Sequence, residues 1–178
     1  VASWLPIVLY TTKADVRADL KVDLKKSLLA KYEPKENLSF LAPPKINKQI
    51  RPNLSTMSAV VITRDSHQSQ FQLEVRSSLN TLASGFSDLF KLGSLQASPE
   101  GKAAMSKIAE GIRQLADHHY DLSKTRRAFI VPLLNFLGKM ASDSALVDDL
   151  LFGSNFTEEV NAAQTMKKVA NRMAKKAQ

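Results

Sequence analysis

The 178-residue chain contains no cysteine, only six glycines and few aromatic residues. The absence of cysteine excludes disulfide bonds, thiolate zinc sites and cysteine nucleophiles, and it permits a reducing compartment. Gly85, Gly93 and Gly101 are isolated, and the chain has neither a phosphate-binding loop nor a G-x-S-x-G nucleophile turn. We therefore expect a protein that is not an enzyme and that takes no cofactor and no small-molecule substrate.

Long hydrophobic runs are also missing. The most apolar short stretch, WLPIVLY at residues 4–10, is far too short to span a bilayer, and Pro6 interrupts it. We expect this stretch to form an extended arm that docks on this subunit or on a neighbouring one; the end of a signal sequence is the alternative. No other stretch approaches the ~18 apolar residues of a membrane span, so we do not expect a membrane protein.

Negative charge is the scarcer sign, because 25 lysines and arginines face 17 acidic residues, for a net charge of +8. Residues 1–53 carry ten basic and five acidic side chains, and residues 101–178 carry twelve and eight. The middle, residues 54–100, is nearly neutral with three and four. Two basic ends favour a polyanionic partner, whether nucleic acid, an anionic membrane surface or an acidic protein.

What the sequence does contain is helical periodicity. Apolar residues recur every four positions between about Asp15 and Lys31 and predict an amphipathic helix there. Four prolines then prevent a continuous helix, because each fixes φ and removes an amide donor. They predict a connector that extends to about Asn53, with a short helical turn near residues 45–50. The prolines are Pro34, Pro43, Pro44 and Pro52.

A long central helix is predicted across residues 64–90, where apolar residues alternate in steps of three and four. Such a seam needs a facing helix, either in the same chain or in a second copy. The first half of this helix is polar, SHQSQ at 66–70, and we expect it to project from the body. AVVIT at 59–63 is the one stretch with a rival strand pattern. The seam residues are Phe71, Val75, Leu79, Leu82 and Phe86.

Helix start and stop signals divide the remainder. Ser98, followed by Pro99 and Glu100, predicts the start of a helix that runs to about His119, and Ser123 predicts the start of another. Pro132 should kink that helix or mark a helix start nearby. A short helix over 145–151 should end at Gly153 in a left-handed cap, and Thr157 should cap a basic last helix.

The predicted fold is therefore all-α, a multi-helix bundle with a long central helix, an N-terminal arm and a Pro-rich connector. We divide the chain into an arm at residues 1–13, an amphipathic helix plus connector at 14–53, and a helical core domain at 54–178. The run Asp117–Asp121 resembles a metal site, since two carboxylates four apart flank His118. One short run supplies at most two or three ligands, so we interpret it as a polar helix end and expect no metal.

Two clusters of basic residues are candidates for nucleic-acid contact. Lys124, Arg126 and Arg127 lie near the expected start of a helix, where their charge opposes the helix dipole; a partner, or a solvated end beside Asp121 and Asp117, accounts for them. The tail is basic and amphipathic, which suits phosphate contact, an anionic membrane or an ordinary charged helix face. Aromatic residues are not interleaved with the charges, so nucleic-acid binding should be phosphate-directed and indifferent to sequence. The tail cations are Lys167, Lys168, Arg172, Lys175 and Lys176.

Three blocks resemble a known family. KYEPKENLSFLAPPKINKQI at 31–50, LSKTRRAFIVPLLNFL at 122–137 and DDLLFGSNFTEEV at 148–160 are similar, in order and spacing, to the Gag-like first protein of DIRS-type retroelements, the tyrosine-recombinase class of retrotransposons. The similarity extends from about Lys31 to Val169, although Leu38 stands where many relatives have cysteine. A domesticated, helical, dimer-forming domain of the same source occurs in the alpha isoform of lamina-associated polypeptide 2.

The resemblance implies a structural protein that self-associates as a capsid or nucleoprotein component and packages RNA, or a host protein that reuses the domain as a scaffold. It implies an intracellular location, cytoplasmic or nuclear, or a virus-like particle. Zinc-knuckle cysteines and a protease signature are absent, so RNA binding would depend on the basic patches. Our first hypothesis is a self-associating, nucleic-acid-binding structural protein, and the second is a dimeric nuclear or chromatin adaptor that binds no nucleic acid.

Overall fold

The computed structural model describes residues 4–18, 20–52, 54 and 59–174, and it divides the chain into two units, 1–33 and 34–178. The prediction of an all-α protein is confirmed, since the described residues form helices and no strand. The described part contains one isolated bridge of parallel type, between Lys45 and Leu150. None of the described helices is both long and apolar enough to cross a membrane.

The first unit contains two short helices, α1 (Pro6–Arg17) and α2 (Val22–Lys31). The expected extended arm is wrong, because Pro6 occupies the first turn of a helix, where its missing amide proton costs nothing. The single helix expected from Asp15 to Lys31 is also wrong. Ala18 adopts extended backbone angles that end α1, and Lys21, which precedes α2, also has non-helical angles. Neither helix has a buried residue.

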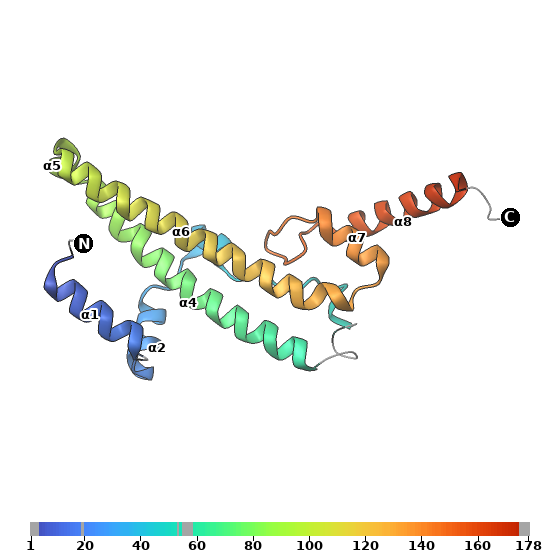
Figure 1. The fold of residues 1–178 in the computed structure, drawn as a ribbon, viewed down its shortest axis with the longest axis horizontal. Coiled ribbons are helices and arrows are strands. Elements are labelled where there is room, and N and C mark those ends of the chain that lie inside the picture. Colours follow the sequence, from blue (N-terminus) through green and yellow to red (C-terminus); the bar gives the residue numbers. More distant parts are fainter. Residues whose placement is uncertain (1–3, 19, 53, 55–58, 175–178) are drawn as a thin grey trace. The chain divides into compact units, whose positions relative to one another are not determined.

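The second unit is built on an antiparallel hairpin, in which α4 (Ala59–Phe90) packs along α6 (Pro99–Ile130) and the short α5 (Gly93–Ala97) joins them (Figure 1). The long central helix is confirmed, and residues 59–63 belong to it rather than to a strand. The predicted start of α6 is also confirmed, because the Ser98 hydroxyl accepts a hydrogen bond of 2.9 Å from the Gly101 amide.

α6 continues without interruption through the predicted break between His119 and Ser123. The Ser123 side chain does not cap a helix; it is buried and accepts a hydrogen bond from Gln72 of α4. Helix α6 ends instead before Pro132, which lies in the 3₁₀ turn η2 (Val131–Leu133). The effect expected of Pro132 is therefore confirmed, although the helix it ends began far earlier than the sequence indicated.

Two further helices follow, α7 (Phe136–Ser144) and α8 (Phe156–Met173), which pack on each other. Residues 145–151 do not form the expected helix, but Gly153 has the expected left-handed backbone, with φ of 75°. A Cβ at Gly153 would lie 2.5 Å from the Leu146 carbonyl oxygen. Both this close approach and the left-handed backbone therefore favour glycine at this position. Thr157 lies inside the first turn of α8 and does not cap it.

The connector joins the second unit. After the 3₁₀ helix η1 (Glu36–Leu41), it contributes Ile50 and Leu54 to the main apolar core. The other members of this core come from the end of α6, from α7 and from the segment that leads into α8. The core therefore ties the connector to the C-terminal half of the chain. Those other members are Ile130, Leu134, Ala141, Ala145, Leu151, Phe152 and Phe156.

Candidate nucleic-acid interface and self-association surface

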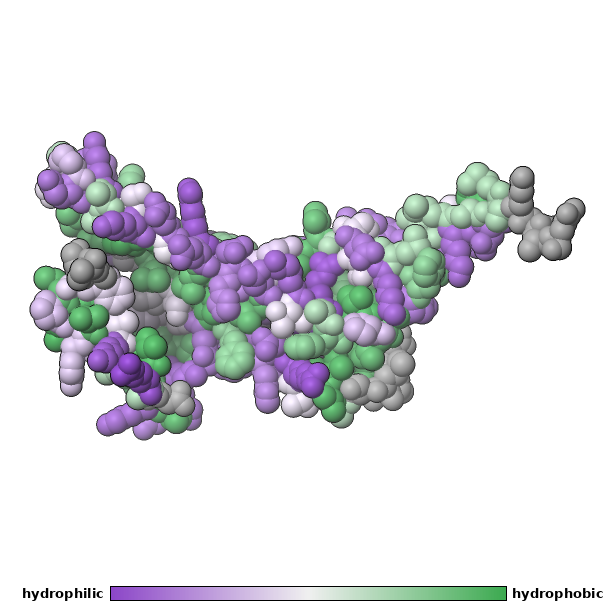
Figure 2. All heavy atoms as spheres, in the orientation of Figure 1, coloured by the Kyte–Doolittle hydropathy of each residue, from purple (hydrophilic) through white to green (hydrophobic). Residues whose placement is uncertain are grey.

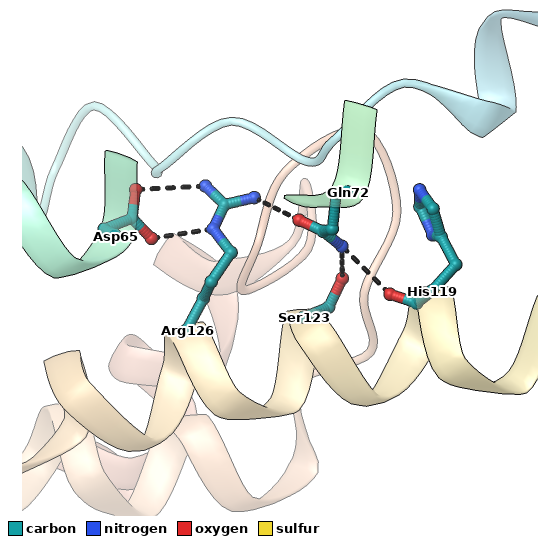
Figure 3. Close-up of polar contacts among 5 residues, drawn as sticks. All are labelled: Asp65, Gln72, His119, Ser123 and Arg126. Carbon is teal, nitrogen blue, oxygen red and sulfur yellow. Dashed lines mark hydrogen bonds and ion pairs between the residues drawn. The ribbon is translucent and has the colours of Figure 1, made fainter. Parts of the chain in front are cut away.

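A buried polar network joins α4 to α6 (Figure 3). Arg126 forms two bonds with Asp65, 2.7 Å from Nε to Oδ1 and 3.1 Å from Nη2 to Oδ2, and donates from Nη1 to Gln72 at 2.8 Å. Gln72 in turn donates to the Ser123 hydroxyl at 2.8 Å and to the His119 carbonyl at 3.0 Å. The side chains of Arg126 and Asp65 are only 3% and 9% exposed. The positive charge of Arg126 is therefore paired with Asp65 inside the protein.

Two of the predicted nucleic-acid-binding residues are corrected by these contacts. Arg126 cannot reach a phosphate from its buried position, and Arg127 is also turned inward. The Arg127 guanidinium donates to the carbonyls of Ala145 and Ser142 and lies 5.0 Å above the Phe152 ring. Burial lowers the pKa of Arg127, against the charges of Tyr120 and Asp143. The prediction placed both arginines at the exposed start of a helix that was expected to begin at Ser123. They belong instead to the last turns of α6.

Lys124, the third residue of that cluster, remains exposed. Its Nζ lies 2.6 Å from a carboxylate oxygen of Asp121 and 5.3 Å from the centre of the Tyr120 ring. The hydrogen bond and the charge of Asp121 raise the pKa of Lys124. The environment of Lys124 therefore agrees with the alternative interpretation, in which this cation is solvated and lies beside Asp121.

Helix α8 presents the second cluster to solvent. Lys167, Lys168 and Arg172 are exposed, and Lys167 lies 5.1 Å from the centre of the Phe136 ring. No residue described after Ala163 is buried, so the second half of α8 is exposed to solvent apart from the contact between Lys167 and Phe136. Figure 2 shows hydrophilic and hydrophobic side chains together along this helix. The remaining predicted cations, Lys175 and Lys176, lie outside the described residues.

The predicted self-association seam is divided between the hairpin and solvent. Leu79 is buried at 5% exposure, whereas Phe71 and Leu82 are 49% and 46% exposed. Val75 and Phe86 are half-buried. The facing helix that the seam requires is α6 of the same chain, yet two of the five seam residues remain available to another partner.

The polar first half of α4 does not project, because it contributes the buried members of the network. Asp65, Gln72 and Leu79 are buried at intervals of seven, so two polar residues continue the column that Leu79 occupies. The spacing of apolar residues alone does not reveal these two polar members of the column. Extending the register of Leu79 backwards through residues 72 and 65 would have found this column.

Two of the stretches that resemble the known family, 31–50 and 148–160, contact each other through residues 45–47 and 149–153. Asn47 is 1% exposed, and its side chain donates to the Gly153 carbonyl at 2.8 Å and accepts from the Phe152 amide at 2.9 Å. The backbone of Lys45 forms two further bonds across this contact. Its amide donates to the Asp149 backbone carbonyl at 2.9 Å, and its carbonyl accepts from the Leu151 amide at 2.8 Å. These residues clamp the connector to the turn before α8 and have a structural role.

The histidine-containing run 117–121 lies inside α6, so the expectation that it forms a polar helix end is wrong. His118 is exposed, while His119 Nε2 lies 3.1 Å from the Leu41 carbonyl oxygen. Burial lowers the pKa of His119, Arg126 and Arg76 add to this effect, and the Leu41 carbonyl opposes it. Among the described residues, no group of three or more potential ligands could hold a metal ion.

The helical hairpin with its buried polar network, the connector bonded to the turn before α8, and the solvent-facing basic helix define an all-α protein. The chain belongs to the family described as a domain of unknown function (DUF8747), whose model matches residues 12–154. The matched stretch ends just before α8. Neither a curated protein nor a solved structure matches the chain.

Proposed function

We propose that this chain is a self-associating structural protein of the Gag-like type, which contacts nucleic acid through exposed cations on α8. It would act inside the cell, in the cytoplasm, in the nucleus or in a virus-like particle. The observation that carries the proposal is that each unit, taken by itself, leaves several large apolar side chains exposed. Patches of this kind mark interaction sites in proteins that fold normally.

The first unit has exposed apolar side chains of its own. Its helices have 12 and 10 residues and no buried side chain. Helices this short are marginal in water unless packing stabilises an apolar face. Leu5, Ile7 and Val16 are nevertheless 68%, 65% and 80% exposed. A unit with this composition needs an external surface to cover it.

The hairpin of the second unit has a separate set of exposed apolar side chains. Phe71 and Leu82 are about half exposed and lie eleven positions apart, which places them on one side of α4. Val75 lies between them on the same side and is half-buried. Contact between two such faces would bury these side chains without disturbing the polar network, because the network uses a different side of the helix.

The nucleic-acid part of the proposal rests on α8. Lys167, Lys168 and Arg172 are exposed, and residues 160–174 contain no acidic side chain. Phosphate contacts of this kind release counterions, so binding should weaken steeply as salt increases. The positions of Arg126 and Arg127 reduce the candidate surface to α8 and Lys124.

The test is the solution mass of the purified chain, measured by light scattering with and without a generic RNA near physiological salt. The proposal predicts self-association and larger particles with RNA. Reversing the charges in Lys167→Glu, Lys168→Glu and Arg172→Glu together should abolish RNA retention. Lys102→Glu, Lys107→Glu and Arg113→Glu make the same charge change on the exposed side of α6 and serve as the control. RNA retention that survives the α8 changes would refute the nucleic-acid role.

A second candidate is a dimeric scaffold that binds nuclear or chromatin proteins and no nucleic acid. The observation that favours it is the apolar stripe on α8, where Met166, Val169 and Met173 are 62%, 44% and 74% exposed. Contact with phosphates would not bury these apolar side chains, whereas a hydrophobic groove on a partner protein would bury them. A fixed dimer whose mass is insensitive to RNA would favour this candidate.

A further inference from the structure

A groove on the second unit lies between the connector and the first half of α4, with a volume of about 750 Å³. Its walls are largely apolar: the connector contributes three prolines, and Ile62 and Leu73 extend from α4. Volume and lining are in the range of pockets that hold small ligands and short peptide segments. The prolines are Pro43, Pro44 and Pro52, whose fixed φ limits the conformational entropy that binding would remove.

The charges around this groove are not balanced. Lys45 and Arg51 line it, are exposed, and form no ion pair within the described chain. The one carboxylate in the lining, Asp65, already accepts both hydrogen bonds from Arg126. The groove therefore offers two free cations beside an apolar wall, and it has no anion of its own to neutralise them.

We propose that this groove binds a short acidic segment of a partner protein. An apolar side chain of the segment packs between the prolines and α4, and its carboxylates pair with Lys45 and Arg51. An arginine guanidinium can form two parallel hydrogen bonds with one carboxylate. Arg51 is therefore the residue that contributes most to the preference for an acidic segment. The hydroxyls of Ser66 and Ser69 also line the groove and can bond the backbone of the segment.

Nucleic acid is a poorer fit for the same groove. The lining contains no aromatic side chain on which a base could stack. Two cations are also few for a phosphate-directed site. This inference is independent of the proposed function, because none of its residues belongs to α8 or to the exposed seam.

The test is a titration of the isotopically labelled full chain, followed by amide chemical shifts. The probe is the blocked peptide Asp-Leu-Glu-Leu-Asp, and its matched control replaces the acids by Asn and Gln. We expect saturable shifts at Ile46, Ser69 and Leu73 with the acidic peptide and none with the neutral one. Arg51→Glu should weaken binding by about tenfold or more. Lys48→Glu, an exposed change outside the groove, should leave binding unchanged.

Lys45→Glu is the second variant and carries the test if Arg51→Glu does not give a folded spectrum. Equal shifts with the neutral peptide, or no shifts at millimolar acidic peptide, would overturn the proposal. The proposal would also be overturned if a single-stranded RNA oligonucleotide shifted the same amides at a lower concentration than the peptide. Lys45 and Arg51 would then bind phosphates rather than carboxylates.

Discussion

Arg126 shows how a single residue can have a role opposite to the one its charge suggests. It is a cation in a basic stretch, yet its partners are Asp65 and Gln72 of the facing helix. Removing one member of a buried pair leaves the other charge buried and uncompensated. We expect Arg126→Leu to lower the free energy of unfolding by about 3–5 kcal/mol, measured by urea denaturation.

Two variants separate the pair from the mere loss of a cation. Asp65→Leu combined with Arg126→Leu should recover most of the lost stability, because no charge remains buried. Lys124→Leu removes an exposed cation from the same helix and should change stability little. A loss below about 1 kcal/mol for Arg126→Leu would contradict the buried position of this side chain.

His119 makes stability depend on pH. Its pKa in the folded protein is lowered from the ordinary value of about 6.5, because burial disfavours the imidazolium and the nearby cations Arg126 and Arg76 do the same. The unfolded chain therefore binds the proton first as pH falls. The stabilisation is fully present above about pH 6.5 and is lost as pH falls toward the lower folded pKa.

The pH dependence can be assigned by comparing neighbouring histidines. Urea unfolding between about pH 7.5 and 5 should show a declining stability in the wild type, and His119→Gln should flatten this decline. Glutamine keeps a donor that can reach the Leu41 carbonyl. His118→Gln, at an exposed position, should retain the wild-type slope. An unchanged slope in His119→Gln would assign the effect to other groups.

At the scale of elements, the connector is fixed to the segment before α8 by a buried amide. The Asn47 side chain bonds to Gly153 and Phe152, more than a hundred positions away in the sequence. Asn47→Ala leaves a buried carbonyl and a buried amide without these partners, so we expect a loss of about 2–4 kcal/mol in the free energy of unfolding. Asn171→Ala, on the exposed part of α8, is the matched control.

The element boundaries differ in how far they depend on such distant contacts. Ser98 caps α6 through Gly101, three residues away, and Pro132 ends the same helix by its own covalent structure. Both were predictable because the cause is local. The continuation of α6 through Ser123 was not, because the bond that buries this hydroxyl comes from Gln72 on another helix.

At the scale of the whole molecule, the uncovered side of α4 should control self-association. We expect the double change Phe71→Glu and Leu82→Glu to lower the solution mass of an associated wild type to that of the monomer, because two charges would be desolvated in the interface. Light scattering measures the mass. Ser84→Glu, two residues beyond Leu82 and therefore on the opposite side of the helix, should leave it unchanged.

The outcome that would contradict this expectation is an associated protein whose mass is unaffected by the double change. The exposed apolar side chains of the first unit would then become the principal candidate for the interface, since neither of its helices has a buried residue. Shared loss of association in Ser84→Glu would instead indicate general destabilisation, which circular dichroism detects.

The sequence by itself determined the all-α class, the long helix α4, the start of α6, the turn at Pro132 and the left-handed Gly153. Each of these follows from spacing, or from residues a few positions apart, because periodicity, capping and proline geometry are local effects. The acidic start and basic end of α8 belong to the same group, with Glu158 and Glu159 in its first turn and Arg172 in its last.

The tertiary structure decided which charged residues remain at the surface. Arg126 and Lys168 are both cations on predicted helices, and nothing in their local sequence distinguishes a buried side chain from an exposed one. The difference arises because Arg126 meets Asp65, 61 positions away, whereas no described residue of α8 after Ala163 is buried. Burial depends on which distant segments the fold brings together, and periodicity along one helix carries no information about the partner.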